Sequence, residues 1–352
     1  MPKRTSSKPT VSRKKQHVEL TLTHDVSFQG KTTGLEMWEF RHNALCELNF
    51  SDVDPSTTFL GKKLTLPFMI SSMTGGYPDA LLINRALAAV CEEMGIGMGV
   101  GSQRQALEDI EYHRTFSVVR EVAPSIPIIG NIGAAEVVRM KNADGVKRLA
   151  DLVGADGFAI HLNPLQELLQ PEGTPEMRGV LEGIRMLVRE LAIPVVAKEI
   201  GAGLSADVVR RILEAGVRHI DVAGAGGTSW AGVEILRHKS TASATSVFWN
   251  WGIPTATAVQ QAAQLKGRPE QFTLIASGGL ASGMDAAKCI ALGADLAAAA
   301  RPLLKALHRG GKRALREQIS AWGFQLRGAM FLTGCRTISE LQHAPIERTT
   351  TL

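Results

Sequence analysis

Apolar runs of six to eight residues recur eight times along the central part of the chain, and each ends in glycine or in a polar cluster. Runs of this length, rich in Val, Ile, Ala and Met, are typical of strands that are buried on both faces. They span residues 67–73, 97–102, 126–133, 157–163, 194–200, 219–224, 273–279 and 295–301. We therefore predict eight buried strands.

The segments between these runs carry apolar residues three and four positions apart, which is the spacing of a helix with one buried face. Residues 206–216 (ADVVRRILEAG) and 284–293 (MDAAKCIALG) show it most clearly. Eight strand–helix units over about 240 residues match a (β/α)8 barrel, which typically takes about 250. A doubly wound sheet would have fewer strands and a GxGxxG turn after the first strand, and the chain has no such turn there. The predicted fold class is α/β, a (β/α)8 TIM barrel.

The repeat does not cover the whole chain of 352 residues, and this predicts three parts. Residues 61–310 form the barrel. Residues 1–60 form a tail and an extension with a strand pair, and residues 311–352 form a cover of one or two helices. About fifty residues separate the sixth run from the seventh, and we place this insertion at the C-terminal face of the barrel, where barrel enzymes carry their loops.

The charge of the chain is concentrated at its start. The formal net charge is +5, but the first 15 residues hold six Lys and Arg and no acid, so the remaining chain carries about −1. A nucleic-acid-binding domain carries its positive charge on a folded face, so we expect no nucleic-acid partner. Residues 1–10 are expected to be a solvated, disordered tail.

Membrane and redox signals point to the cytoplasm. The apolar runs are far shorter than the ~18–20 residues of a membrane span, and no secretory signal is visible at the start. The four cysteines, Cys46, Cys91, Cys289 and Cys335, lie far apart without a CxxC pair. We expect reduced thiols, a cytoplasmic location and no membrane insertion.

Polar and small residues follow nearly every predicted strand. In a (β/α)8 barrel, such residues at the C-terminal strand ends form the active site, although any one of them could be an ordinary turn residue. They are Ser72, Met73, Thr74, Gly101, Ser102, Arg104, Asn131, His161, Asn163, Gln166, Glu167, Lys198, Glu199, Gly226, Gly227, Thr228, Gly278, Gly279, Ala300 and Arg301. We expect them to meet at one mouth of the barrel.

The last two strands carry the most specific signal. Gly278 and Gly279 end the seventh strand, and Ala300 and Arg301 end the eighth. Loops at these two positions, with a helix N-terminus, form the usual phosphate site of such barrels, and glycine lets the backbone approach the phosphate oxygens. The arrangement resembles the flavin mononucleotide (FMN) site of FMN-dependent oxidoreductase barrels.

Other strand ends fit a flavin. Ser72, Met73 and Thr74 could lie along the isoalloxazine edge, and Ser102 and Asn131 could bind its polar rim. The same site includes Thr228.

Lys198 could place a cation near the end of the ring that becomes negative on reduction. The alternative is an ion pair between Lys198 and Glu199, but neighbouring residues of a strand point to opposite faces.

Ten segments in order carry a family resemblance: RKKQHV, RHNALCELNFSDVD, SSMTGG, GVGSQRQALED, GNIGA, HLNPLQE, QPEGTP, AKEIGAG, GAGGTSW and WGIPT. Together they resemble the type 2 isopentenyl-diphosphate Δ-isomerases, from about residue 13 to about residue 310. The resemblance implies an isomerase of isoprenoid biosynthesis that interconverts isopentenyl and dimethylallyl diphosphate. It implies FMN in its reduced form, Mg²⁺, NADPH as the reductant without net redox change, and a homo-oligomer that is a tetramer or an octamer.

The same resemblance assigns the strand-end residues. It implies that Gln166 is a catalytic amide facing the allylic carbons and that Glu167 holds Mg²⁺ against the diphosphate. His161 and Lys198 belong to the catalytic group, and Asn163 helps to position substrate.

The substrate's two ends have their own predicted contacts. Arg13, Lys14, His17 and Arg104 contribute to the diphosphate site, so the motif RKKQH folds over the mouth. Trp230, with Thr228, covers the prenyl carbons.

Two other classes of enzyme use the same kind of barrel. A flavin hydroxy-acid oxidase needs a His-Gly-Gly-Arg-Gln type of element before the seventh strand, and the chain reads GRPEQFTLIASGG there, without histidine. The nucleotide dehydrogenases of similar fold need a loop cysteine near GAGGTSW, which the chain lacks. The sequence therefore favours the isomerase.

Overall fold

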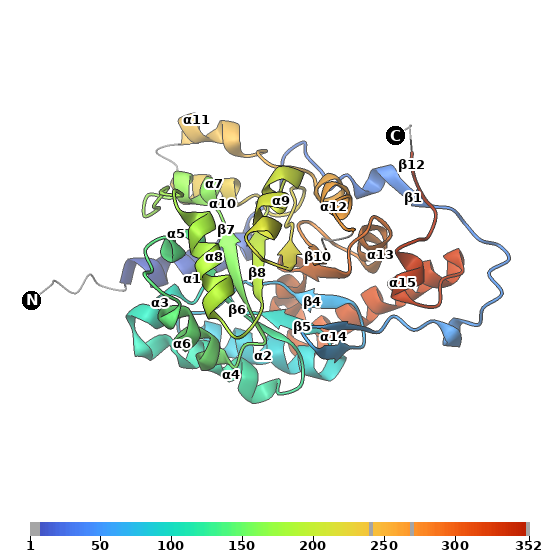
Figure 1. Ribbon diagram of the computed structural model, residues 1–352, viewed down its shortest axis with the longest axis horizontal. Coiled ribbons are helices and arrows are strands. Elements are labelled where there is room, and N and C mark those ends of the chain that lie inside the picture. The colour runs from blue at the N-terminus through green and yellow to red at the C-terminus, as the bar shows by residue number, and fades with distance from the viewer. Residues whose placement is uncertain (1–7, 239–241, 268–270, 350–352) are drawn as a thin grey trace, which may run out of the picture.

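A computed structural model describes residues 8–238, 242–267 and 271–349 (Figure 1). Eight parallel strands form a closed barrel in chain order, and β11 pairs with β4 to close it. The strands are β4 (Phe68–Ile70), β5 (Gly97–Gly99), β6 (Ile128–Gly133), β7 (Gly157–Leu162), β8 (Val195–Glu199), β9 (His219–Asp221), β10 (Thr273–Ala276) and β11 (Leu296–Ala299). All eight predicted strands and the predicted fold class are confirmed.

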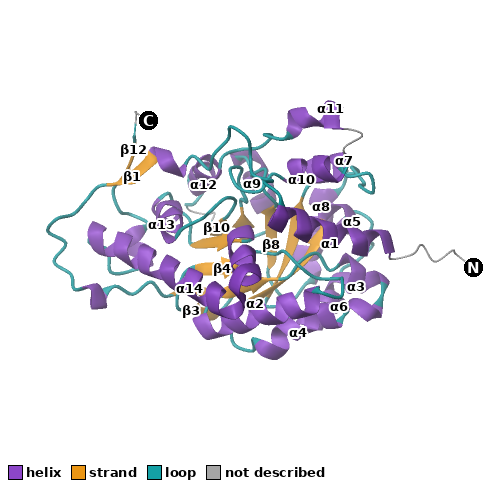
Figure 2. Ribbon diagram, turned by 180° about the vertical axis from the view of Figure 1, so that it is seen from behind, coloured by secondary structure: helices purple, strands orange, loops and turns teal. Residues whose placement is uncertain are grey.

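Helices surround the barrel, as Figure 2 shows with strands in orange inside a purple ring. Those that follow the strands are α2 (Ala80–Met94), α4 (Arg114–Val122), α6 (Asp144–Val153), α8 (Val180–Glu190), α9 (Ala206–Glu214), α12 (Thr255–Ala263), α13 (Gly283–Ala291) and the start of α14 (Arg301–Thr333). Helices α9 and α13 confirm the two clearest helical patterns of the sequence.

Shorter elements lie in the connections. They are α3 (Arg104–Glu108), η3 (Ile110–Tyr112), α5 (Ala134–Val137), α7 (Pro164–Leu169), α10 (Trp230–Arg237), α11 (Ala242–Thr245) and η5 (Ser246–Phe248). The long insertion after β9 supplies α10, α11 and η5, and α10 packs against α7. Because residues of this insertion line the cavity at the C-terminal strand ends, the insertion lies at the predicted face.

The alternation of side chains along the strands explains why a cavity forms at one end only. Strand residues two positions apart point to the same side. Ile129, Ala159, Val196 and Ile275 form an apolar layer inside the barrel. Two positions further along the same strands stand Asn131, His161, Lys198 and Ser277, all of which line the cavity. The next layer is therefore polar.

A hairpin closes the opposite end of the barrel. Strands β2 (Thr57–Phe59) and β3 (Lys62–Leu64) pair, and Phe59 and Leu64 pack into the apolar layer inside the barrel. The Nζ atom of Lys62 donates to Asp156 Oδ2 at 3.0 Å, just before β7 begins. This hairpin is the predicted strand pair, and it crosses the predicted boundary at residues 60 and 61.

The C-terminal part packs on the barrel and returns to the N-terminal extension. Helix α14 is interrupted at Gly310 and Gly311, where Gly311 has a φ of +64°. The break falls at the predicted start of the helical cover, and α15 (Ile338–Leu341) follows α14. Strand β12 (Ile346–Arg348) pairs antiparallel with β1 (Trp38–Phe40), which lies between the short helices η1 (Leu35–Met37) and η2 (Phe50–Asp52).

The start of the chain differs from its prediction. Helix α1 (Lys8–Thr23) lies across the mouth of the barrel and begins within the segment that we expected to be disordered. Residues 1–7 lie outside the described residues. Side-chain contacts of the helix with the barrel, described below, account for it, because isolated helices of this length are marginal in water.

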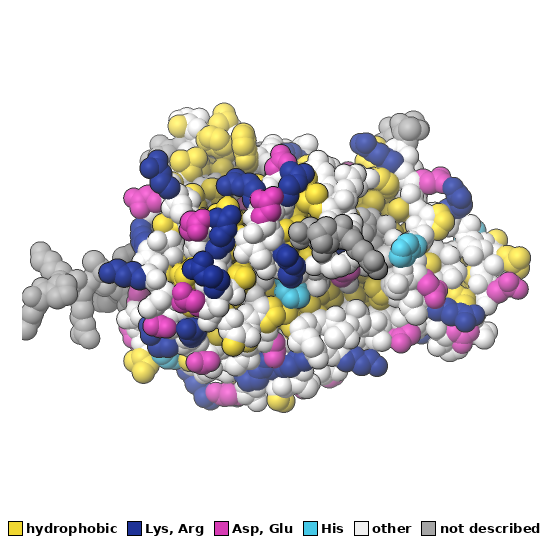
Figure 3. Space-filling view, in the orientation of Figure 1, with side chains coloured by type: hydrophobic (Ala, Val, Ile, Leu, Met, Phe, Trp, Pro, Cys, Tyr) yellow, Lys and Arg dark blue, Asp and Glu magenta, His cyan; other side chains and the backbone are white. Residues whose placement is uncertain are grey.

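Charges of both signs are mixed on the surface. On the side shown in Figure 3, Lys and Arg side chains alternate with Asp and Glu rather than gathering. Pairs such as Arg185 with Glu182 and Arg210 with Asp207 join opposite charges on single helices. Within the described ranges, we find no helix that is both long and apolar enough to span a membrane.

Candidate active site

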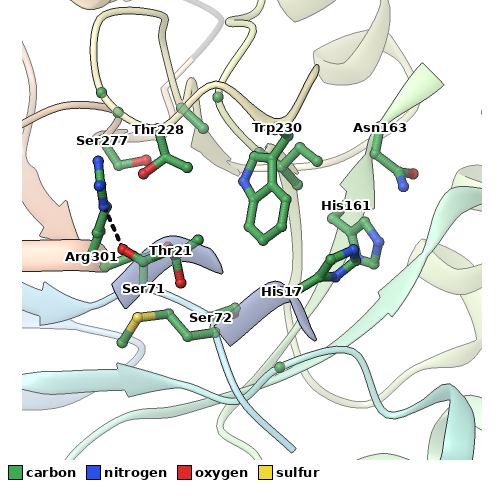
Figure 4. Close-up of a pocket in the computed structure, with 18 of the residues that line it drawn as sticks. His17, Thr21, Ser71, Ser72, His161, Asn163, Thr228, Trp230, Ser277 and Arg301 are labelled. Atoms are coloured by element: carbon green, nitrogen blue, oxygen red, sulfur yellow. Dashed lines mark hydrogen bonds between the residues drawn. The ribbon is translucent and has the colours of Figure 1, made fainter. Parts of the chain in front are cut away.

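One cavity of about 480 Å³ opens at the C-terminal ends of the strands, beneath α1. Figure 4 shows side chains from α1, β7 and the loop after β9 that surround it. Its wall contains nineteen of the twenty predicted site residues: Arg13, Lys14, His17, Ser72, Met73, Ser102, Arg104, Asn131, His161, Asn163, Gln166, Glu167, Lys198, Thr228, Trp230, Gly278, Gly279, Ala300 and Arg301. The strand ends and the N-terminal motif therefore meet, as predicted.

Thr74 is the exception. It is buried outside the cavity wall, where its hydroxyl donates to Asn84 Oδ1 and its carbonyl oxygen accepts from Asn84 Nδ2 at 3.2 Å. The sequence placed Thr74 on the flavin because it stands in the loop after β4. Its side chain holds that loop against α2, and its predicted cofactor contact stays a prediction.

A glycine cradle lies at the ends of β9 and β10. Gly278 and Gly279 have φ values of +98° and +78°, and a Cβ added at Gly278 would lie 2.0 Å from Gly224 O. A Cβ at Gly227 would lie 2.5 Å from Gly279 N. Only glycine permits this approach of two backbones, which leaves N–H groups beside Ala300 for a phosphate. The cradle fits the phosphate of FMN.

An amide and an imidazole join β6 to β7. The Nδ2 atom of Asn131 donates to Val100 O at 3.2 Å, so its Oδ1 faces His161 Nδ1 at 2.9 Å. Burial lowers the pKa of His161 to about 3, and the nearby Lys198 lowers it further. His161 is thus a neutral imidazole that donates from Nδ1 and offers Nε2 as an acceptor.

Lys198 has its charge partner on the next strand. Lys198 and Asp221 are paired in the register of β8 and β9, and Lys198 Nζ lies 3.8 Å from Asp221 Oδ2. The same Nζ donates to Glu199 O at 2.5 Å. Ser277 completes the group by donating to Asp221. Asp221 and Ser277 were not predicted, although each stands two positions after an interior residue of its strand.

Glu199 points to the other side of β8, as the alternation predicted. Its Oε2 accepts from the backbone N–H groups of Ile200 and Gly201 at 2.6 Å each, and from that of Ala202. Burial nevertheless raises the pKa of Glu199 to about 7. Because Ile200 and Gly201 line the cavity, Glu199 fixes part of the cavity wall from behind.

The HLNPLQE motif forms the end of β7 and the start of α7. Asn163 Nδ2 donates to Gln166 Oε1 at 3.1 Å and to Glu167 Oε1 at 3.0 Å. Glu167 Oε2 accepts from Thr174 N at 2.7 Å. Asn163 therefore orients both the amide and the carboxylate toward the mouth.

A buried carboxylate that the sequence analysis missed lies against this motif. Glu234 Oε1 accepts from Gln166 Nε2 at 3.1 Å and contacts His17 Nε2 at 2.9 Å, and Glu234 Oε2 accepts from Arg237. The side chains of His17 and Arg237 hold the pKa of Glu234 at about 2, despite its burial. A lone Glu in the apolar stretch WAGVEIL was the available signal.

Cations gather at the mouth near this motif. Arg13, Lys14 and Arg104 line it, and burial with the charge of Arg13 lowers the pKa of Lys14 to about 7. Lys14 Nζ donates to Gly75 O at 2.8 Å and to Ser102 O at 2.5 Å. Arg104 pairs with Glu136 at 2.9 Å. This excess of buried positive charge suits a polyanionic group.

A metal ion in this cavity would have to take some of its ligands from a bound molecule. Among the residues that the structure describes, no three His, Cys, Asp or Glu side chains form a group that could hold a metal ion. Mg²⁺ commonly takes one or two carboxylates together with phosphate oxygens and water. Glu167 has the oxygen chemistry for such a ligand and lies beside the cations.

Comparison with known families defines the class of the protein. The sequence model of the FMN-dependent dehydrogenase family matches residues 10–125 and 165–348. The chain therefore belongs to this family of FMN-binding barrels, in agreement with the glycine cradle.

Relatives define its place within the class. It is 47% identical to the isopentenyl-diphosphate delta-isomerase of Chlorobaculum parvum over 98% of this chain and 99% of that protein. It is 43% identical to the enzyme of the same name from Methanosarcina acetivorans, over 96% and 92%. The chain thus belongs to the isopentenyl-diphosphate delta-isomerases of the FMN-dependent, type 2 family.

Solved structures share the fold at low sequence identity. A lactate oxidase from Pediococcus acidilactici has a TM-score of 0.69 and 14% identity, with 97% of this chain and 95% of that chain covered. A mandelate oxidase in complex with (S)-2-phenylpropionate has a TM-score of 0.66 and 17% identity, with 97% and 99% covered. These similarities concern the barrel alone.

Proposed function

We propose that the protein interconverts isopentenyl diphosphate and dimethylallyl diphosphate, in isoprenoid biosynthesis. One observation carries the proposal: the cavity has two separate sites for phosphate chemistry. The glycine cradle at Gly278 and Gly279 suits the cofactor, and the cluster of Arg13, Lys14 and Arg104 across the mouth suits a diphosphate. The names of the close relatives support the same activity.

The residues of the mouth would bind the substrate at both of its ends. Arg13, Lys14 and Arg104 would neutralise the diphosphate, and Glu167 would share a Mg²⁺ ion with it. Trp230 would cover the apolar carbons, and its ring lies edge-on to His17 with 5.3 Å between ring centroids. Charge at one end and an aromatic surface at the other match a prenyl diphosphate.

The reaction adds a proton to one alkene carbon and removes one from another, so the catalytic groups must be held against carbon in a dry site. FMN in its reduced form, when bound, supplies the acid–base group beside the alkene. Gln166 would orient or relay a proton, because an amide is a poor base. His161, neutral and held by Asn131, would accept a hydrogen bond at Nε2.

Lys198 would place its ammonium group near the negative end of a reduced flavin. Asp221 partly offsets this charge from the neighbouring strand. NADPH would reduce the flavin once, without being consumed in each turnover. A homo-oligomeric assembly stays a prediction from the family resemblance, and a cytoplasmic location stays a prediction from the cysteine pattern and the apolar runs of the sequence.

An anaerobic assay tests the proposal. The purified protein should show the visible spectrum of FMN, or take up added FMN. With Mg²⁺ and a small amount of NADPH or dithionite, it should convert isopentenyl diphosphate to dimethylallyl diphosphate through many turnovers. Oxidation of one NADPH per product would contradict an isomerase, and a protein that cannot be reconstituted with FMN would contradict the cofactor.

A further inference from the structure

Arg301 connects the barrel to the start of the chain. Its guanidinium donates from Nε to Thr21 O at 2.8 Å, from Nη1 to Ser27 Oγ at 3.0 Å and from Nη2 to His24 O at 2.9 Å. Each guanidinium nitrogen thus has a partner in the N-terminal extension. The acceptors precede Arg301 by 274 to 280 positions in the sequence.

Two of these acceptors lie at the C-terminal end of α1. The last carbonyl groups of a helix lack partners within it and favour a nearby cation. Helix α1 has no basic residue in its own last turn. Arg301 supplies that cation from the barrel. It stands just after β11 and is the first residue of α14.

Backbone hydrogen bonds fix the chain just beyond α1, whereas Lys14 and His17 hold the middle of the helix. Phe28 N donates to Gly227 O at 3.1 Å, and Ser229 N donates to Val26 O at 2.8 Å. These bonds attach residues 26–28 to the loop after β9. Arg301 is the side chain that extends this attachment to the end of the helix.

We propose that Arg301 is a positioning residue for the substrate, which holds α1 over the mouth so that Arg13, Lys14 and His17 meet the diphosphate. This proposal rests on the proposed function. Its alternative is the assignment made from the sequence, in which the Arg301 side chain binds the phosphate of FMN. The two roles make opposite predictions, because one acts on the substrate through α1 and the other on the cofactor directly.

The test compares Arg301→Ala with Arg309→Ala, which removes a positive charge from an exposed position of the same helix. Three quantities are measured for the FMN-loaded full chain: the KM for isopentenyl diphosphate at saturating FMN, the Kd of FMN by fluorescence titration, and the rate of trypsin cleavage at residues 13–15. The last is followed by mass spectrometry and needs no catalytic activity.

We expect Arg301→Ala, which removes three charge-assisted hydrogen bonds, to raise the KM and the cleavage rate by at least about tenfold, the effect of losing one such bond, and to change the Kd of FMN by less than about threefold. Arg309→Ala should change none of the three. A tenfold rise in the Kd of FMN with unchanged cleavage would overturn the proposal in favour of a phosphate ligand. Unchanged cleavage and unchanged KM would overturn it as well.

Two milder variants keep the proposal testable if Arg301→Ala does not fold. Ser27→Ala removes one acceptor, and Arg301→Lys keeps the charge but loses the planar set of donors. Both should raise the cleavage rate at residues 13–15 by a smaller factor, and no rise in either would contradict the positioning role. If the wild-type chain lacks isomerase activity, the proposed function fails, while the cleavage assay still decides whether Arg301 holds α1.

Discussion

The amide nitrogen of Gln166 donates to Glu234 Oε1 at 3.1 Å, so a side chain of α7 takes its orientation from a carboxylate on α10. The other end of the same amide accepts from Asn163 Nδ2. Because His17 shares Glu234 Oε1, the N-terminal helix and the motif at the end of β7 meet at one oxygen atom. Gln166 therefore has one preferred orientation, which a proton-relay role requires.

Gln166→Ala should lower kcat by at least about a hundredfold, since a positioned proton-transfer partner typically contributes about 10²–10⁴. The Kd of FMN should remain unchanged, because the cradle at Gly278 and Gly279 is untouched. Steady-state kinetics and a flavin titration on the same preparation check both. A fall in kcat of less than about threefold would mean that Gln166 has no catalytic part.

Glu234→Gln should lower kcat by about tenfold to a hundredfold without preventing FMN binding, because the amide of Gln166 loses its charged acceptor. Glu172→Gln is the matched control. Glu172 accepts from Arg237, as Glu234 does, but has no hydrogen bond with Gln166 or His17. Equal losses in the two variants would trace the effect to Arg237 rather than to Gln166.

Glu167→Gln should raise the Mg²⁺ concentration that gives half-maximal rate, together with the KM for substrate, because a neutral amide is a poorer ligand for a hard dication. An amide at this position keeps one acceptor oxygen, so it can retain the hydrogen bond from Asn163 or the one from Thr174 N, but not both. The measurement is the rate as a function of Mg²⁺ at fixed substrate. An unchanged titration would place the metal elsewhere.

Neighbouring lysines of α1 should differ in effect. Lys14 is directed into the cavity, whereas Lys15 lies on the outer side, 3.9 Å from Asp79. Lys14→Ala should raise the KM for substrate by about tenfold or more, on the scale of a lost charge-assisted contact, and Lys15→Ala by less than about twofold, as for an exposed ion pair. Similar KM values for the two variants would show that the helix acts through its overall charge.

The lowered pKa of Glu234 also predicts how the free energy of unfolding depends on pH. Its ordinary pKa of 4.5 in the unfolded chain falls to about 2 in the fold, because His17 and Arg237 favour the anion. When the pH falls below about 4.5, the unfolded state takes up the proton first, so the free energy of unfolding decreases. A contribution of about 3 kcal/mol should be complete above that pH and be lost as the pH approaches 2.

Urea unfolding at a series of pH values between 6 and 3 tests this dependence. The wild-type chain should lose stability more steeply than Glu234→Gln over the acid part of the series, since the variant has no group that titrates at that position. Parallel curves for the two proteins would mean that Glu234 has an ordinary pKa in the folded state.

The sequence was most informative where a local pattern determines structure. Alternation along each strand determines which residues face the barrel interior, and it correctly brought Asn131, His161 and Lys198 into one cavity. It could not separate a residue that faces the cavity from one that holds a loop, as Thr74 shows. Both kinds of residue follow a strand and carry the same polar groups.

Contacts between distant segments were the least predictable. Nothing near residue 234 in the sequence indicates that Glu234 meets Gln166 and His17, because the three come from α10, α7 and α1. The sequence placed RKKQH over the mouth but did not predict that it lies in a helix from Lys8 to Thr23, whose position depends on Arg301 and Lys14 meeting backbone carbonyl groups far away in the chain. Such contacts depend on the finished barrel rather than on a local pattern.

The attachment of α1 also bears on when the protein becomes functional during synthesis. Residues 8–23 are made before the barrel, and their partners at Glu234 and Arg301 follow more than 200 residues later. Strand β1 pairs later still, because its partner β12 comprises residues 346–348. The segment that we expect to bind the diphosphate is therefore translated before the parts of the barrel that hold it, and a chain released before residue 346 would lack the partner strand of β1.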